Sequence, residues 1–193
     1  MDNKFDLRTI IAIIIGTMVV VILNCCSLYD TQFRSMWLMQ ACSVVVVVIA
    51  AVYGIEAGIL IPVAACTIYG VTMRDPIITK EIIFLLLAGI VTGHYKDRFM
   101  VDKGDFSGVR ILDYVVIETG VAVLTWLCLY PLGSFYLKQS DLRVTLTDGL
   151  KNCGICMIGK VCICLPVLLL LNVVLKKKFM VEEARKEYLY DRK

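Results

Sequence analysis

Three polar side chains that could do chemistry stand inside long apolar runs of this sequence, namely Gln40, Glu118 and Lys160. A polar group is costly to surround with hydrocarbon, so each of the three is a candidate functional residue. A buried carboxylate and a buried ammonium can neutralise each other, or one of them can face a polar cavity that holds a ligand. A proton relay is a third interpretation. The sequence leaves the three open.

Other residues share a helical face with this pair. Asn152, Cys156 and Lys160 are spaced four residues apart and therefore lie on one face of a helix, and Trp126 adjoins the face that carries Glu118. Counting from the ends of the apolar runs predicts that Lys160 lies about 10 Å closer to the outer surface than Glu118. A lysine side chain covers part of that gap. A buried ion pair need not stabilise a fold, and this consideration slightly favours the ligand-binding interpretation.

Signatures of catalysis are missing from the sequence. It has one histidine, and no phosphate-binding or dinucleotide-binding glycine motif. Cys153-x-x-Cys156 has redox or metal spacing but no second pair, and most of the nine cysteines lie in apolar runs, where they act as small apolar residues. We therefore expect that the protein is not an enzyme and that it has no cofactor and no metal site. A disulfide that joins Cys25 or Cys26 to Cys153 stays open.

Six apolar runs must position these side chains. The chain has 193 residues, is 59% hydrophobic and has a mean hydropathy of +0.80. A hydrocarbon core about 30 Å thick needs roughly 20 apolar helical residues, and helices or closed barrels alone satisfy every backbone group there. We predict one all-α integral membrane domain, residues 1–193, in which a bundle of six transmembrane helices spans about 9–23, 37–53, 57–73, 78–95, 112–132 and 150–175.

The distribution of basic residues predicts the orientation of this bundle. With the N-terminus inside, the cytoplasmic segments hold thirteen Lys and Arg residues and the external ones hold six. The positive-inside rule therefore puts both termini in the cytoplasm, with a tail at 176–193 whose mixed charges indicate a short helical extension. The net charge of +3 comes from flanks and loops, so we expect no nucleic-acid partner.

Small residues indicate where helices approach closely. Ala12 and Gly16 form a notch in a first run that is otherwise bulky, and this small-x-x-x-small spacing suits a partner helix, inside the chain or in another subunit. The same spacing occurs at Gly54/Gly58 and at Gly89/Gly93.

The order of several motifs resembles a known family. They are the first run from Thr9 to Gly16, Asn24 at its end, Gln40, the turn from Tyr53 to Gly58, the glycine-rich stretch from Ala88 to Gly93, and Trp126 followed by Pro131. Together they resemble the S components of energy-coupling factor (ECF) transporters, especially the riboflavin-transporter-like group and its uncharacterised bacterial relatives. Departures fall at 64–67, at 74–78, at Glu118 and at Lys160, in or near the pocket that the resemblance implies, so the substrate does not carry over.

The resemblance implies a substrate-capture subunit of the bacterial plasma membrane. Such a subunit binds a vitamin or vitamin-like small molecule on the outer face and delivers it with a transmembrane coupling subunit and two cytoplasmic ATPases. The first helix would dock on the coupling subunit through Ala12 and Gly16, and the loop after it would cover the pocket. The substrate-binding residues are then expected to be Gln40, Glu118, Trp126, Asn152 and Lys160, with Tyr29 and Arg34 from the covering loop.

Two other interpretations stay open. A six-helix scaffold of the MreD type binds other membrane proteins and no solute, and it leaves Glu118 and Lys160 as a structural pair. The other is a small permease driven by an ion gradient. Such transporters are often built from inverted repeats, and the two halves of this sequence show no clear inverted repeat.

Overall fold

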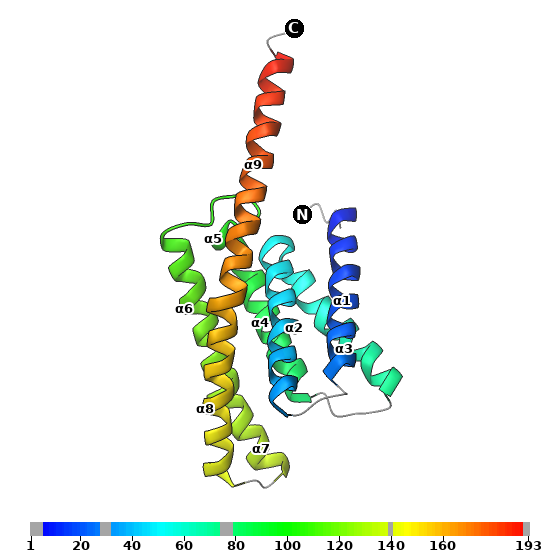
Figure 1. Ribbon diagram of the computed structural model, residues 1–193, viewed down its shortest axis with the longest axis vertical. Helices are drawn as coiled ribbons and strands as arrows, with labels where there is room; N and C mark the ends of the chain where they lie inside the picture. Colours follow the sequence, from blue (N-terminus) through cyan, green and yellow to red (C-terminus); the bar gives the residue numbers. More distant parts are fainter. Residues whose placement is uncertain (1–5, 28–31, 74–78, 139–140, 191–193) are drawn as a thin grey trace.

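The computed structural model describes residues 6–27, 32–73, 79–138 and 141–190, and every element in these ranges is helical (Figure 1). The all-α class predicted from the sequence is confirmed. The elements are α1 (Leu7–Ser27), α2 (Gln32–Tyr53), α3 (Ile55–Met73), α4 (Thr79–His94), α5 (Lys96–Phe99), α6 (Val109–Val123), the π-helical η1 (Leu124–Leu129), α7 (Tyr130–Lys138), α8 (Leu142–Gly159), the π-helical η2 (Lys160–Cys164) and α9 (Leu165–Tyr190).

Three helical stretches are long and apolar enough to cross a bilayer, namely Leu7–Cys25, Val109–Phe135 and Leu142–Lys178. Shorter apolar helices cover Met39–Tyr53, Ile55–Val71 and Ile82–His94. These lengths and compositions are typical of a membrane protein.

The last two helical stretches are longer than the apolar runs that predicted them. Most of the polar segment 133–148, expected as a loop, is helical, because α7 continues to Lys138 and α8 already begins at Leu142. Asp141 caps α8 by accepting a hydrogen bond of 2.9 Å from the backbone N–H of Arg143. At the other end, α9 continues to Tyr190, which confirms a helical extension in the tail. Helix ends follow capping, whereas the prediction followed hydrophobicity.

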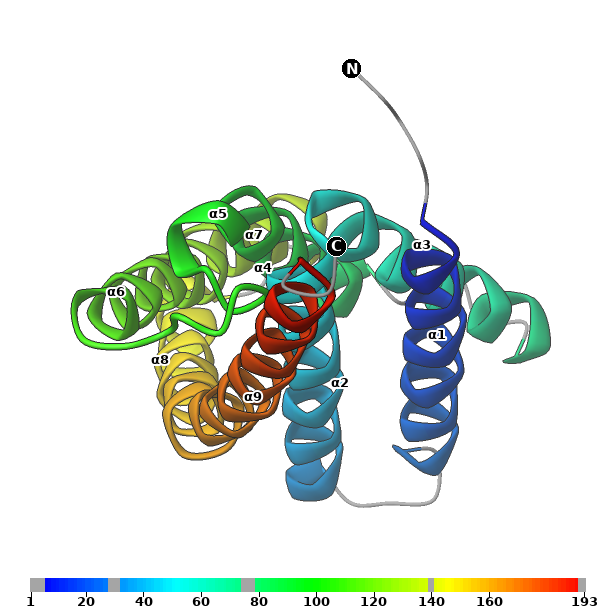
Figure 2. The ribbon, with the colours of Figure 1, turned by 90° about the horizontal axis from the view of Figure 1, so that it is seen from above.

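The helices form two packed groups. The group α1–α4 lies on one side of the molecule, and α6–α9 lie on the other, with α2 and α4 in contact with both (Figures 1 and 2). The column made by α8, η2 and α9 extends past the other helices toward the C-terminus (Figure 1). The contact between the two groups brings α2 and α4 against α6 and α8, which is where the polar residues lie.

Glycines let α3 and α4 pack with their backbones in contact. A Cβ atom on Gly58 would lie 2.2 Å from the carbonyl oxygen of Gly89, and one on Gly89 would lie 2.2 Å from the carbonyl oxygen of Gly58. Near the end of α4, a Cβ on Gly93 would lie 2.5 Å from the backbone nitrogen of Ile55. The small-residue spacing at these positions therefore serves packing within this chain.

The charged segment between α4 and α6 is fastened to α9. Asn172 on α9 accepts a hydrogen bond of 2.8 Å from the N–H of Phe106 and donates one of 3.4 Å to its carbonyl oxygen. Gly104, at a φ of +70°, packs directly on the backbone of Lys176. Arg98 forms a bidentate ion pair with Asp113, donating one hydrogen bond to each carboxylate oxygen, and these hydrogen bonds raise the pKa of the guanidinium group. The segment that leads into α6 is thus held against α9, and α5 is held against α6.

The α3–α4 contact gives a stability prediction. We expect Gly89→Ala to destabilise the protein by about 1–3 kcal/mol, because the added methyl group forces the two backbones apart. Thermal unfolding in mild detergent measures the effect. Gly120→Ala is the matched control, since a Cβ there meets nothing within 4 Å. Equal unfolding temperatures for the two variants would contradict the close contact.

Candidate functional site

Glu118 and Lys160 form a direct ion pair at the contact between the two helix groups. Lys160 Nζ donates to Glu118 Oε2, and the two side chains are 3% and 2% exposed respectively. Glu118 belongs to α6, and Lys160 is the first residue of η2. The two charges therefore contact each other directly in this structure.

The longer helices explain why the two side chains meet. Lys138 ends α7, 20 residues after Glu118, and Leu142 begins α8, 18 residues before Lys160. A difference of two residues corresponds to about 3 Å along a helix axis. The predicted offset of about 10 Å was wrong because it measured depth from the ends of the apolar runs instead of from the ends of the helices.

Residues of α4 complete the surroundings of the pair. Thr92 Oγ1 lies within hydrogen-bond range of Glu118 Oε1 and 2.7 Å from the carbonyl oxygen of Ala88. A hydroxyl group has one hydrogen, so it donates to one of these acceptors at a time. Lys160 Nζ lies 5.3 Å from the centre of the Phe84 ring, which is cation–π range. The pair therefore joins α4, α6 and η2.

Gln40 lies beside this pair and has an unsatisfied acceptor. It is 1% exposed on α2, and a Cβ on Gly159, the residue before Lys160, would lie 3.3 Å from Gln40 Cβ. Its Oε1 atom, like Ser43 Oγ one turn further along α2, has no hydrogen-bond partner within the part of the chain that the structure describes. Buried acceptors without donors are rare, so this oxygen is a candidate contact for a ligand or a water molecule.

Trp126 forms the aromatic side of the same region. It lies in η1, is 2% exposed, and has its ring centroid 5.6 Å from that of Phe84 and 5.6 Å from that of Tyr130. Gly149 on α8 makes room for it, because a Cβ there would lie 2.3 Å from the carbonyl oxygen of Trp126. Both π-helical segments thus border the polar region, and such segments often occur at functional sites.

The structure thus groups four of the predicted site residues into one polar centre, which we define as Gln40, Glu118, Lys160 and Trp126 together with Thr92 and Phe84. Asn152 is half-buried on α8, two helical turns before Lys160. Tyr29 lies outside the described residues, as does the side chain of Arg34.

Two members of the polar centre were not predicted. Thr92 stands in the glycine-rich stretch quoted for the resemblance, and Phe84 is one of several large apolar residues in the same run. A threonine next to small residues at the end of an apolar run was a usable signal. Nothing in the sequence distinguishes Phe84 from its neighbours.

The cysteines and acidic residues form no second site in the ranges that are described. No group of three His, Cys, Asp or Glu residues there could hold a metal ion. Cys25, Cys153 and Cys156 carry free thiols, and the side chain of Cys26 lies outside the described part.

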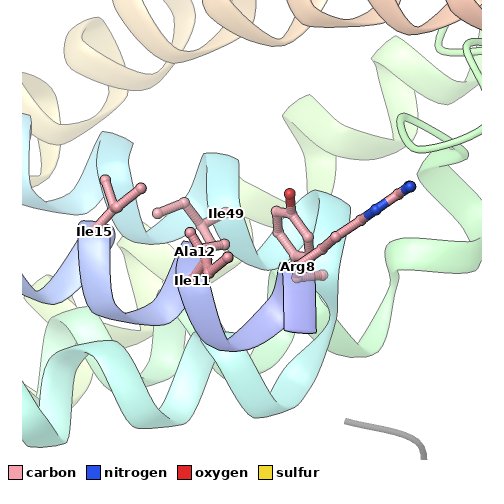
Figure 3. Close-up of a pocket in the computed structure, with 6 residues that line it drawn as sticks. Arg8, Ile11, Ala12, Ile15 and Ile49 are labelled. Carbon is pink, nitrogen blue, oxygen red and sulfur yellow. The ribbon is translucent and has the colours of Figure 1, made fainter. Parts of the chain in front are cut away.

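The two small residues of α1 have different surroundings. Gly16 is buried inside the chain, because a Cβ there would lie 2.5 Å from Ile49 Cδ1 and 2.8 Å from Ile61 Cδ1. Ala12 instead lines a groove between α1 and α2 (Figure 3). Ile49 is nine residues after Gln40 on α2, or about 13 Å along the axis, so the groove and the polar centre are separate.

Comparison with known proteins adds no identification. The chain matches no protein-family model, and no solved structure matches it. The polar centre, the groove and the motif resemblance are the basis on which function can be argued.

The ion pair gives a prediction that separates its charge from its packing. Lys160→Met leaves Glu118 buried without its cation, so we expect a loss of about 3–5 kcal/mol in the free energy of unfolding. The double variant Glu118→Gln/Lys160→Met removes both charges and should recover most of this loss. Thermal unfolding of the wild type and of the two variants in detergent measures these differences in stability.

Lys151→Met is the matched control for this experiment. It also removes a lysine from α8–η2, but Lys151 is 68% exposed and lies 3.9 Å from its partner Asp148. An exposed pair of this kind contributes little. If the double variant were as unstable as Lys160→Met, the buried charge on Glu118 would not be the cause.

Proposed function

We propose that the chain is a multi-pass protein of the bacterial plasma membrane that works as the S component of an ECF-type importer. In this proposal it captures a vitamin-like small molecule on the outer face, and a coupling subunit and two cytoplasmic ATPases drive delivery. The motif resemblance suggests this class. The observation that carries a solute-binding role is the unsatisfied Gln40 acceptor in a buried polar centre.

The proposed topology has six crossings and both termini in the cytoplasm. α2, α3 and α4 contain 22, 19 and 16 residues, so they rise by about 33, 28 and 24 Å. The apolar parts of these helices, Met39–Tyr53, Ile55–Val71 and Ile82–His94, are shorter than a hydrocarbon core of roughly 30 Å, and such helices are accommodated by thinning of the bilayer. Together with the three long helical stretches, these lengths support six crossings.

The chemistry of the polar centre suggests the kind of solute. Gln40 Oε1 needs a hydrogen-bond donor, and Trp126 offers an aromatic surface. Glu118 and Lys160 together can exchange their mutual contact for contacts with a zwitterion, or Lys160 can bind a carboxylate. A solute that carries a carboxylate or both charges, next to a flat ring, fits this set. Opening of the helix contacts around the pair would then accompany binding.

Docking on a coupling subunit is proposed for α1. One face of this helix is buried against α2 and α3, and the other is apolar and exposed within this chain. The exposed face carries Leu7, Ile14, Met18 and Ile22. Ala12 lies at the edge of this face, whereas Gly16 is covered by Ile49 and Ile61. A partner helix would therefore meet the bulky face, with Ala12 at its border.

One observation favours the alternative, an MreD-like membrane scaffold. Glu118 and Lys160 satisfy each other and are almost fully enclosed, as expected of a structural pair that joins helices. In that case the partner would be another membrane protein and no solute would bind.

Gln40→Met distinguishes the two functions. For a capture subunit we expect a small molecule to be retained by the purified wild-type chain in native mass spectrometry, and we expect retention to fall about tenfold in the variant. The fold should be unharmed or more stable, because an unsatisfied buried acceptor is removed. Ser43→Ala is the control that removes a second unsatisfied oxygen on α2.

The contrary result is equally specific. The capture function is wrong if two results are obtained together. The purified wild-type chain retains no small molecule, even when it is prepared from cells supplied with vitamins, and affinity purification from membranes returns no ATPase. Co-purification of other membrane proteins with the same chain would then support the scaffold.

A further inference from the structure

The groove between α1 and α2 has a polar end and an apolar body. Its lining comes from Arg8, Ile11, Ala12 and Ile15 on α1 and from Ile49 and Tyr53 on α2, and its volume is about 380 Å³. Figure 3 shows Arg8 at one end, with its guanidinium group extending beyond the helix, and Ile15 at the other. Four of the six side chains are aliphatic, so the body of the groove suits hydrocarbon.

The groove is closed on the side of Gly16. Ile49 reaches over this glycine, since its Cδ1 atom lies 2.5 Å from where a Cβ would be. Ile61 of α3 fills the space from the other side, 2.8 Å from the same point. The small-residue notch is therefore split, because its Gly16 half is filled from within the chain and its Ala12 half is open.

The length of the groove argues against a membrane-spanning occupant. Arg8 and Ile15 are seven residues apart, which corresponds to about 10 Å along α1. One leaflet contributes about 15 Å of hydrocarbon, half of the roughly 30 Å that a crossing helix spans. The open part of the groove therefore fits within a single leaflet, which is the depth occupied by a lipid chain.

The polar end has the charge that a lipid headgroup requires. Arg8 is exposed at the polar end of the groove, and its backbone N–H lies 3.5 Å from Asp6 Oδ1. Arginine binds phosphate with two parallel hydrogen bonds, and its apolar stem lies along hydrocarbon while the charged group reaches the interface. Tyr53, at the end of α2, also lines the groove, and tyrosine prefers the same interfacial depth.

From this complementarity we propose that the groove binds an anionic phospholipid. One acyl chain lies along Ile11, Ala12, Ile15 and Ile49, and the phosphate is held by Arg8 next to Tyr53. The proposal depends on the groove alone and holds whether the polar centre binds a solute or not.

Native mass spectrometry of the full chain in mild detergent tests this proposal. The probes are dioleoylphosphatidylglycerol, which is anionic, and dioleoylphosphatidylcholine, which has the same chains and no net charge. We expect the wild type to retain the anionic lipid in preference. Arg8→Gln should reduce that preference roughly fivefold, the effect of one basic residue at an anionic surface.

Lys103→Gln is the matched control, because Lys103 is another exposed cation and its loss changes the net charge equally. This variant should keep the wild-type preference to within about twofold. If both variants lose the preference to the same extent, the lipid responds to overall charge and the groove site is wrong. An unchanged preference in Arg8→Gln would overturn the proposal as well.

A second measurement identifies the occupant in membranes. A photo-crosslinking amino acid at Ile15, which lines the apolar end of the groove, should give an adduct with the mass of a phospholipid. The same group at Leu170, an exposed residue on α9, is the control for general contact with lipid and should react with lipids without preference for anionic ones. In membranes that lack the proposed coupling subunit, an adduct of polypeptide mass at Ile15 would show that another protein covers the groove and would refute the lipid site.

Discussion

The ion pair between Glu118 and Lys160 determines how α6 packs against α8 and η2. Taking either charge out of water alone would cost several kcal/mol, so each helix that carries one must bring it to the other. This requirement fixes the axial position of α6 relative to α8 and η2, because a shift of one helical turn, about 5.4 Å, would separate the charged atoms. Thr92 and Phe84 extend the same constraint to α4.

Close packing on the other side of the molecule makes this constraint rigid. α4 carries Thr92 and Phe84 on one side and contacts α3 through Gly89 on another. Two backbones in direct contact cannot slide past each other without collision. The position of α3 therefore fixes that of α4, and α4 in turn fixes Thr92 and Phe84 against the ion pair. The hydrogen bonds between Asn172 and Phe106 likewise hold the segment that leads into α6 against α9. The polar centre is therefore held from both helix groups.

The sequence predicted the helical class, the apolar segments and the residues that are costly to bury, because these follow from composition and from the helical repeat. It could not predict partners that depend on where helices end. The depth of Lys160 was misjudged because α8 begins at Leu142, within a polar segment that hydrophobicity cannot distinguish from a loop. Gly16 and Ala12 looked equivalent, and the packing of Ile49 from α2 makes them different. Side chains from distant segments decide such cases.

α2 connects the two candidate binding regions, and this has a physical consequence. Gln40 in the first half of α2 contacts Gly159 beside the ion pair, and Ile49 and Tyr53 in the second half line the groove. An unbroken helix of 22 residues is stiff, so a rotation of α2 that moves Gln40 relative to η2 also moves Ile49 against α1. An occupant of the groove that displaced α2 would therefore also displace Gln40 relative to η2. Coupling between the regions needs no chain of further contacts, since a single helix belongs to both.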